Sequence, residues 1–367
     1  MTPLAGLKVV ELARILAGPW IGQALADLGA EVVKVESPDG DDTRKWGPPF
    51  IERDGDTSAA YYYAANRGKD CVTADFRTEE GKQAVLGLIQ DADILIENFK
   101  VGGLKKYGLD YNSLSKINPR LIYCSVTGFG QDGPYAKRAG YDFLLQGMSG
   151  LMSITGAQDG QPQKVGVAIT DIVTGLYGTI GILAAVEQRH RTGRGQHLDM
   201  SLLDCATALL ANQAMNYLAT GESPTRLGND HPNIAPYQVM AVQDGHVILA
   251  VGNDGQFQRL CGVLRLAEAK ADARFQTNQL RVANRKALTA ILEEVLAKWT
   301  QADLLAALEA ATVPAGPINT IGQAFEDPQI KHRGMQIAPE GVPGVRGPWK
   351  FSDAELALDK SAPKLPE

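Results

Sequence analysis

Residues 164–178 of this chain read KVGVAITDIVTGLYG and contain a single carboxylate, Asp171. A short β-branched run ends here and a long apolar helix begins, and residues 172–186 carry no charge. A helix of that composition is expected to be buried on all sides. Because an acid at a helix N-terminus meets unpaired N–H groups and the positive end of the helix dipole, the stretch by itself predicts an ionised N-cap.

The same helix carries small residues at three- or four-residue spacing: Gly175, Gly178, Gly181 and Ala185. Residues at this spacing share one face of a helix. Because that face has no bulky side chain, the backbone of another element can approach it closely. We therefore expect a neighbouring helix or strand to pack directly against this small-residue stripe.

Composition limits the classes of partner. The chain has 367 residues, more than one hydrophobic core usually supports, so we expect two domains. A net charge of −6 and a pI near 5.5 argue against a nucleic-acid partner. The one basic cluster is typical of a helix end: Arg189, His190, Arg191 and Arg194. No uninterrupted apolar run reaches membrane-spanning length, so we expect no membrane partner.

The compartment follows from the N-terminus and the cysteines. The first predicted strand begins almost at once, which leaves no room for a signal peptide and favours the cytoplasm. The four cysteines stand far apart without a C-x-x-C pair: Cys71, Cys124, Cys205 and Cys261. We therefore expect buried, reduced thiols, with neither a zinc site nor a disulfide framework.

The first half of the chain alternates strands and helices. Strands are expected at residues 7–12, 30–36, 71–75, 93–96 and 121–125. Helices are expected at 18–28, 78–90, 111–116, 172–190 and 201–219. Such alternation predicts an α/β fold with a parallel sheet covered on both faces and joined by right-handed crossovers. We expect a large Rossmann-like domain over residues 1–220.

The second half has a different character. A segment rich in Gly, Pro and Asn at 221–236 indicates a linker. Strands at 237–242 and 246–251 follow, and the sequence Gln-Asp-Gly between them predicts a hairpin. Charged amphipathic helices are expected at about 256–264, 284–297 and 302–311. We expect a small α+β domain over 237–311, a return linker over 312–329, and residues 330–367 completing the large domain.

The sequence lacks the motifs of several common classes of enzyme. The opening strand–helix–strand unit is similar to a dinucleotide-binding fold, with Glu36 ending the second strand. The turn at residues 13–19 reads ARILAGP, however, so the phosphate-binding glycines are missing and Pro19 lacks an N–H. The sequence contains no P-loop and no G-x-S-x-G nucleophile elbow. The five histidines lack metal-ligand spacing, so we expect no metal site and regard carboxylates as the reactive groups.

Residues 252–256, Gly-Asn-Asp-Gly-Gln, follow a predicted strand and precede a predicted helix. As structure alone, this segment is a turn with a helix start. As chemistry, Gly252 and Gly255 would form a mobile flap whose N–H groups approach a substrate closely. Both interpretations stay open at this point.

Further motifs accompany the Asp171 stretch and residues 252–256. They are LAGP (16–19), LGAEVVKVE (28–36), GDDTR (40–44), NRGK (66–69), ENF (97–99) and GFGQDGP (128–134). With these motifs in order, from about residue 4 to about residue 355, the chain resembles the family III CoA-transferases of the CaiB/BaiF type. Within that family, residues 44–50 and 316–319 are most similar to transferases of C4–C6 dicarboxylates such as succinate, glutarate and hydroxymethylglutarate.

The resemblance implies roles for individual residues. Asp171 falls on the catalytic aspartate, and Leu16 stands where formyl-CoA transferase has a glutamine beside the reaction centre. The positions implied to bind CoA are Leu16, Asn98, Phe99, Lys137 and Arg138, with the loop 66–69 as a further basic candidate. The positions implied to form a flap over the aspartate are Gly252, Asn253, Asp254 and Gly255, a loop with fewer glycines than is usual in the family.

The implied chemistry is covalent. The Asp171 carboxylate would open an acyl-CoA thioester, giving a mixed anhydride and then an aspartyl-CoA thioester, and an acceptor acid would reverse the sequence. CoA and acyl-CoA are then substrates, and no cofactor is bound permanently. Helix-terminal N–H groups would stabilise the oxyanion while the flap excludes water. For a dicarboxylate acceptor, Leu16 leaves space for a longer chain, and Arg44 and Tyr141 are the candidates to bind the second carboxylate.

An α-methylacyl-CoA racemase of the same fold is the alternative. Racemisation needs a second acid/base on the opposite face of the α-carbon, and the family's racemases carry a histidine in a Gly-His-Asp segment. Here the segment is Gly140-Tyr141-Asp142, and a tyrosine with an ordinary pKa near 10 suits that task poorly, so the transferase is favoured. A non-enzymatic binding role ranks third. The resemblance also implies an interlocked ring dimer, so we expect a homodimer.

Overall fold

The computed structural model describes residues 1–366, which fall into two compact units. The large unit comprises residues 1–152, 164–223 and the segment from 327 onward. The small unit comprises residues 153–163 and 224–326. Residues 153–163 therefore lie with the small unit, although the sequence analysis included them in the large domain.

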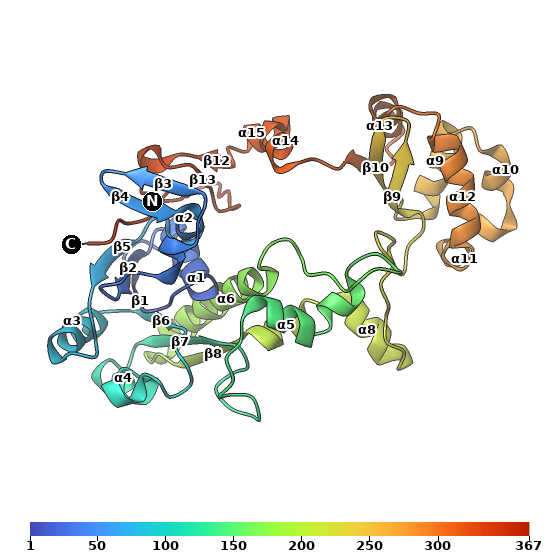
Figure 1. The fold of residues 1–367 in the computed structure, drawn as a ribbon. Coiled ribbons are helices and arrows are strands. Elements are labelled where there is room, and N and C mark those ends of the chain that lie inside the picture. Colours follow the sequence, from blue (N-terminus) through green and yellow to red (C-terminus); the bar gives the residue numbers. More distant parts are fainter. Residues whose placement is uncertain (367) are drawn as a thin grey trace. The chain divides into compact units, whose positions relative to one another are not determined.

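The large unit is built on a six-stranded parallel sheet with the order β5-β2-β1-β6-β7-β8 (Figure 1). The strands are β1 Lys8–Glu11, β2 Glu31–Glu36, β5 Asp70–Thr73, β6 Ile94–Glu97, β7 Ile122–Thr127 and β8 His197–Ser201. The parallel α/β architecture is thus confirmed. Strand β8 was not predicted, because its five residues include no β-branched side chain that would indicate a strand.

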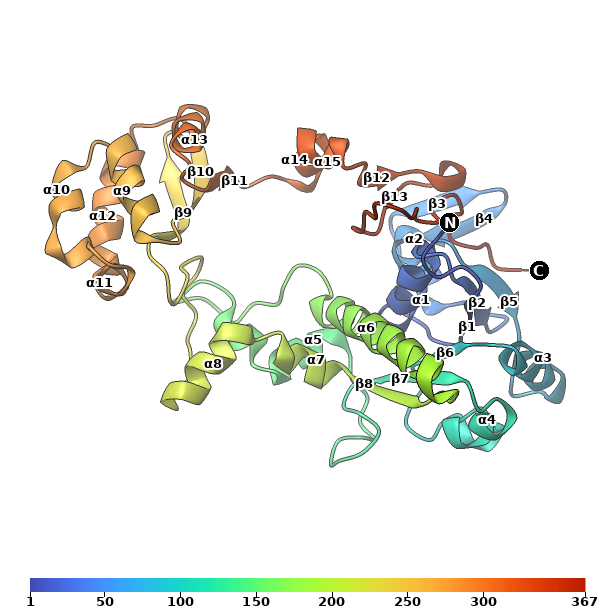
Figure 2. The ribbon, with the colours of Figure 1, turned by 180° about the vertical axis from the view of Figure 1, so that it is seen from behind.

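Helices cover both faces of this sheet (Figures 1 and 2). One face packs against α1 (Ala17–Asp27) and α6 (Ile169–Thr192), and the other against α3 (Glu79–Gln90) and α4 (Tyr111–Ile117). Consecutive residues of β1 enter opposite cores, as expected for a strand buried on both faces. The unit also contains β3 Phe50–Arg53, β4 Asp56–Ala59, α2 Ala60–Asn66, α5 Asp142–Met148, α15 Pro328–His332, β12 Gln336–Ile337 and β13 Gly344–Val345.

The small-residue stripe of α6 lies against neighbouring side chains, as predicted. A Cβ added at Gly175 would lie 2.8 Å from Trp20 of α1, and one at Gly178 would lie 2.5 Å from Ile21. At Gly181 the nearest atom, 2.8 Å away, belongs to Leu198 of β8. The glycines therefore allow α6 to approach both α1 and the edge strand of the sheet.

The prediction that this helix is buried on all sides is wrong. Leu176, Tyr177 and Ile180 are exposed on the side of α6 away from the sheet, and Ile180 keeps 61% of its surface exposed. By length and composition α6 could cross a membrane, a test that the core helix of a soluble protein passes as well. Its packing against the sheet and α1 is that of a core helix with one uncovered apolar side.

The helix predicted over 201–219 is in fact two helices, α7 (Leu202–Ala208) and α8 (Ala211–Thr220). The chain breaks at Ala211, whose φ of +44° lies in the left-handed region. An alanine gives no sequence signal for such a break, because glycine and asparagine are the usual residues there.

The small unit contains the predicted hairpin, β9 (Tyr237–Val242) with β10 (Gly245–Ala250). A third strand, β11 (Ala315–Pro317), extends the antiparallel sheet from within the expected return linker. The helices are α9 Asp254–Val263, α10 Ala267–Ala271, α11 Asn278–Ala283, α12 Arg285–Leu296, α13 Gln301–Ala310 and α14 Ile321–Glu326. The unit has its own hydrophobic core, formed by the hairpin and the helices around it.

A fully buried carboxylate lies beneath α1 in the large unit. Glu11, at the end of β1, pairs with Lys34 of β2 at 3.1 Å and with Lys69 before β5 at 2.8 Å. None of the three side chains has exposed surface. Helix α1 crosses this carboxylate at Gly22, where an added Cβ would lie 1.8 Å from Oε2 of Glu11. Gly22 is therefore required by the ion pairs beneath the helix.

We expect Gly22→Ala to lower the free energy of unfolding by about 3 kcal/mol or more, because the methyl group must displace a helix or a buried charge. Gly87→Ala in α3 is the matched control, since no atom lies within 4 Å of its added Cβ. That change should stabilise the protein by about 0.5–1 kcal/mol. Urea unfolding measures both variants, and similar effects at the two sites would contradict the explanation.

Candidate active site

The strand order of the large unit reverses between β1 and β6, and ligands of doubly wound sheets bind at the carboxyl ends of such strands. Asn98, which follows β6, meets the turn that follows β1. Its Oδ1 accepts a hydrogen bond from the N–H of Arg14 at 2.9 Å, and its Nδ2 donates to the carbonyl of Arg14 at 2.7 Å. The side chain expected to line a CoA pocket therefore fixes the backbone at the point where a ligand would enter.

The turn after β1 contains a strained residue. Ile15 has a φ of +72°, unusual for a β-branched side chain and costing about 1–3 kcal/mol. Its N–H donates to both carboxylate oxygens of Asp41, at 3.2 and 3.4 Å. Leu16 follows directly, buried at the N-cap position of α1. Leu16, which the resemblance places beside the reaction centre, is thus positioned by a strained turn that is hydrogen-bonded to the Asp41 carboxylate.

Asp171 lies in the first turn of α6 and is not its N-cap, which is Ala168. The capping interaction comes from another helix: Oδ1 of Asp142, the first residue of α5, accepts the N–H of Thr170 at 2.8 Å. Oδ2 of Asp142 accepts a hydrogen bond from Gln146, also at 2.8 Å. Within residues 1–366 the Asp171 carboxylate accepts no comparable hydrogen bond. The capping prediction is therefore wrong, and the Asp171 carboxylate is left available.

Burial, and to a smaller extent the nearby carboxylate of Asp142, raises the pKa of Asp171 to about 7. The expectation that Asp171 stays fully ionised is therefore corrected. Tyr61 of α2 lies near the same two acids, since burial and then the charges of Asp171 and Asp142 raise its pKa. Sequence reasoning missed Tyr61, which belongs to no motif, and named Asp142 only as part of the segment 140–142 without a role beside Asp171.

Other residues implied by the resemblance lie on the surface of the large unit. Tyr141, directly before α5, is 66% exposed. Lys137 and Arg138 are exposed, and the Arg138 guanidinium lies 4.4 Å from the ring centre of Tyr135. Phe99 is half-buried on the core of the α3 and α4 face. Tyr141 adjoins Asp142, the residue that caps α6.

Two expected binding roles are wrong. The Arg44 guanidinium is buried and binds Glu36 through two nitrogens at 2.8 Å, and it also reaches the hydroxyl of Tyr62 at 2.6 Å. It serves the fold and cannot face a substrate carboxylate. In the loop 66–69, Lys69 is buried on Glu11, and Arg67 is paired with Asp27 at 2.7 Å, so the loop's two basic side chains cannot bind CoA.

Residues 252–255 belong to the small unit and include the first two residues of α9. Asn253 is the N-cap of that helix, and its side chain accepts the N–H of Gln256 at 2.9 Å. A Cβ added at Gly252 or Gly255 would meet its nearest atom at 3.5 Å, an ordinary contact. Contacts within the small unit therefore do not require glycine at either position.

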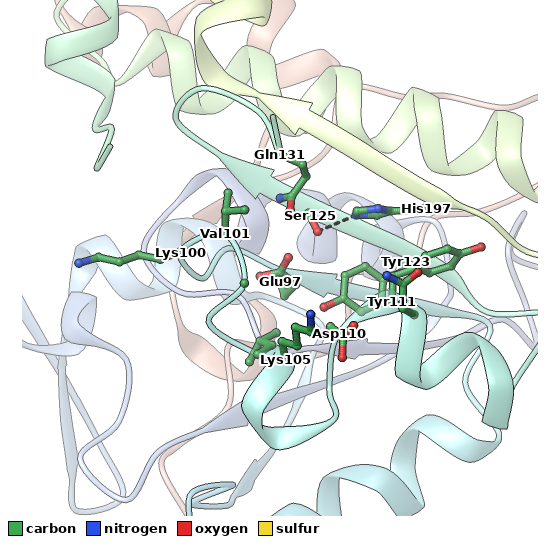
Figure 3. A pocket seen from close by; sticks show the side chains of 13 residues that line it. Glu97, Lys100, Val101, Lys105, Asp110, Tyr111, Tyr123, Ser125, Gln131 and His197 are labelled. Atoms are coloured by element: carbon green, nitrogen blue, oxygen red, sulfur yellow. Dashed lines mark hydrogen bonds between the residues drawn. The ribbon is translucent and has the colours of Figure 1, made fainter. Parts of the chain in front are cut away.

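A cavity of about 240 Å³ lies elsewhere in the large unit (Figure 3). Its walls include Glu97, Ser125 and His197, and Ser125 Oγ lies 2.9 Å from Nε2 of the histidine. Burial raises the pKa of Glu97 to about 7 and lowers that of His197. The wall residue Tyr123 belongs to the core of the α3 and α4 face, opposite α6, so this cavity does not contain Asp171. Sequence reasoning missed it because its residues come from several separate segments.

No metal site accompanies Asp171: the described residues contain no group of three His, Cys, Asp or Glu side chains that could hold an ion. All four cysteines carry free thiols. Three of them are buried, as expected, and Cys71 is partly exposed.

Comparison with known proteins decides the family. The model of CoA-transferase family III matches residues 4–367. The chain belongs to CoA-transferase family III. A succinate–glutarate CoA-transferase of Agrobacterium fabrum is 56% identical over 100% of this chain and 93% of its own length. A succinyl-CoA:glutarate CoA-transferase of Mus musculus is 43% identical over 100% of this chain and 84% of its own length. A CaiB/BaiF family crystal structure from Brucella suis is 64% identical, with a TM-score of 0.90 over 99% of this chain and 96% of that one.

As a family III member the chain is a CoA-transferase, and acyl-CoA thioesters and free carboxylates are its substrates. The racemase alternative fits less well, because the relatives carry transferase names and Tyr141 stands where a racemase has histidine.

The raised pKa of Asp171 has a consequence for the stability of this transferase. Between the unfolded pKa near 3.8 and the folded value near 7, the folded state binds more protons, so stability is lost as the pH rises through this range. We expect Asp171→Asn to raise the free energy of unfolding by about 2 kcal/mol at pH 8 and to leave it nearly unchanged at pH 4. Denaturant unfolding at both pH values tests this, with the exposed Asp132→Asn as control. Equal effects at the two pH values would refute the assignment.

Proposed function

We propose that this transferase moves CoA from succinyl-CoA, or a similar acyl-CoA donor, to a C4–C6 dicarboxylate such as glutarate, with Asp171 as the nucleophile. The proposal is carried by Asp171, a partly buried carboxylate in the first turn of α6 whose pKa is raised to about 7, chiefly by burial. The substrate class is supported by relatives at 56% and 43% identity whose names pair succinate or succinyl-CoA with glutarate.

The reaction proceeds through covalent intermediates on Asp171. The carboxylate attacks the thioester carbonyl of the donor and the C–S bond breaks. CoA thiolate is released, and Asp171 and the donor acid form a mixed anhydride. The thiolate then attacks the aspartyl carbonyl, releasing the donor acid and forming an aspartyl-CoA thioester. The acceptor carboxylate attacks the same carbonyl and expels the thiolate, which finally attacks the acceptor's acyl carbonyl. The products are acceptor-CoA and the regenerated aspartate.

Residues of the large unit supply the surroundings for these steps. Asp171 lies at the positive end of a 24-residue helix, which favours the negative charge of each tetrahedral intermediate. Lys137 and Arg138 are exposed and available for the CoA phosphates. Asn98 fixes the turn before Leu16, which borders the acyl group. No permanently bound cofactor is needed, because both reacting groups come from Asp171 and the substrates.

The distal carboxylate of a dicarboxylate acceptor needs a partner, because burying an unpaired charge is costly. Arg44 cannot provide it, since Glu36 and Tyr62 already occupy its guanidinium. Tyr141 stays a candidate hydrogen-bond donor, being exposed directly before the α5 residue that caps α6.

We further propose that the enzyme is a cytoplasmic homodimer. Its reduced thiols suit the cytoplasm. The large unit exposes many apolar side chains on three of its helices, more than a stable monomer usually leaves to water. They are Phe143, Leu144 and Met148 on α5, Leu176, Tyr177 and Ile180 on α6, and Met215, Tyr217 and Leu218 on α8. A second copy of the chain would cover them.

Ile180→Glu tests the dimer. The side chain is exposed in the single chain, so a charge costs little there but would be buried without a partner in a dimer. We expect light scattering after size exclusion to show a dimer for the wild type and a shift toward monomer for the variant. Ile117→Glu on α4, which is 52% exposed and away from the three helices, is the control and should stay dimeric. A monomeric wild type would refute the proposal.

The catalytic proposal is tested with succinyl-CoA and a panel of free acids, read by mass spectrometry. Glutarate should yield glutaryl-CoA, and kcat/KM should rise with pH through about 7 as Asp171 ionises. Asp171→Asn should lower transfer by about 1,000-fold or more while the protein stays folded, and hydroxylamine should trap modified Asp171 in the wild type alone. Full activity in the variant, or rapid α-hydrogen exchange in deuterium oxide without transfer, would overturn it.

A further inference from the structure

Glu97, the last residue of β6, folds its carboxylate back onto the backbone that follows the strand. Its Oε2 accepts the N–H of Phe99, two residues further along the chain, at 2.8 Å. Glu97 is buried and keeps only 5% of its surface exposed. The residue between the two is Asn98, whose side chain binds both backbone groups of Arg14. One buried acid therefore closes the turn from which Asn98 reaches the segment after β1.

A chain of hydrogen bonds leads from this carboxylate to an imidazole on β8. Ser125 of β7 is the neighbour of Glu97 in the sheet, and its hydroxyl donates to the carboxylate. The same Oγ lies 2.9 Å from Nε2 of His197 (Figure 3). Because a hydroxyl has one hydrogen, the imidazole must donate to Ser125 while Ser125 donates to Glu97. Burial lowers the pKa of His197, so the ring is mainly neutral at pH 7 and carries its proton on Nε2.

Within the described residues, hydrogen bonds and no salt bridge support the charge of Glu97. Burial raises its pKa, the hydrogen bonds from Ser125 and Phe99 lower it, and the charge of Asp199 raises it, so that it lies at about 7. The other titratable side chains on the walls of the cavity are Lys100, Lys105, Asp110, Tyr111, Tyr123 and His197. Near neutral pH the ionised and protonated forms of Glu97 are therefore both populated.

The charge of Glu97 decides how firmly the N–H of Phe99 is held. A hydrogen bond to an ionised carboxylate is about twice as strong as one to a neutral acid. Once Glu97 takes up a proton, its own O–H can donate to Ser125, whose hydroxyl then turns toward His197. The turn at 97–99 thereby loses its strongest restraint, and the packing of Phe99 against Phe76 remains.

We propose that Glu97 is a positioning residue of the transferase, whose ionised carboxylate holds the turn at 97–99 in the conformation in which Asn98 lines the CoA site. This inference rests on the proposed function and on the CoA-binding role implied for Asn98. Glu97 acts through the backbone of Phe99, from a cavity on the face of the sheet opposite α6. The affinity for CoA should therefore rise as Glu97 ionises.

Calorimetric titration with CoA from about pH 5.5 to 8.5 tests the proposal. All proteins carry Asp171→Asn, because Asp171 would otherwise titrate in the same range. The affinity should rise by about tenfold as the pH passes 7. Glu97→Gln keeps an oxygen for the N–H of Phe99 but cannot ionise, so it should show the low affinity at every pH. Asp110→Asn, which removes a charge from the same cavity wall, is the control and should keep the full pH dependence.

Ser125→Ala provides a second test, which a merely structural role would not pass. The substitution removes a hydrogen bond that favours the ionised form of Glu97, so its pKa should rise. The midpoint of the affinity change should therefore move to higher pH. The phosphate of CoA titrates in the same way with every variant, so the differences between variants report on the protein. If Glu97→Gln fails to fold, this midpoint still decides the question.

A pH dependence that Glu97→Gln leaves unchanged would overturn the proposal. So would a loss of affinity by one factor at every pH, because that result describes a purely structural contact. An affinity that falls as Glu97 ionises would also overturn it, since the carboxylate would then only repel the phosphates of CoA. Absence of CoA binding and of transfer in the protein with Glu97 and Asp171 intact would instead refute the proposed function, so the two failures are distinguishable.

Discussion

One buried carboxylate organises the part of the large unit that carries the site. Glu11 lies between the ammonium groups of Lys34 and Lys69, and none of these side chains is exposed. Each ion, if left unpaired at this depth, would cost several kcal/mol, so the segments that supply them must stay together. β1, β2 and the segment before β5 are thereby joined beneath the first helix, at the end of the sheet where the switch point lies.

The same ion pairs also fix the backbone turn that precedes α1. Lys34 also binds the carbonyl of Ala13 at 2.8 Å and the carboxylate of Asp41 at 3.0 Å, and burial opposes its charge while these acids raise its pKa. Asp41 in turn accepts the N–H of Ile15, the residue with positive φ before α1. The strained turn is therefore maintained by an ion network below it, and the position of Leu16 follows from that network.

Local patterns in the sequence predicted the helices and strands well, and the contacts between distant residues poorly. The alternation of strands and helices, the hairpin and the small-residue stripe of α6 all depend on neighbours within a few positions, and the structure confirms them. Arg44 was misassigned because an arginine closing a polar motif looks the same whether it faces a ligand or, as here, a buried Glu36. The helix cap supplied by Asp142 and the Asp254–Arg281 pair join residues 27 or more positions apart, a separation at which periodicity carries no information.

The raised pKa of Asp171 meets one requirement of the chemistry and creates another. An ordinary aspartate, with a pKa near 3.9, is a weak nucleophile toward a thioester, and a pKa raised to about 7 strengthens it while leaving about half of it ionised at neutral pH. The same change makes Asp171 a poorer leaving group, so in the proposed reaction the final anhydride persists longer. A longer-lived anhydride is more exposed to hydrolysis, and exclusion of water then matters more.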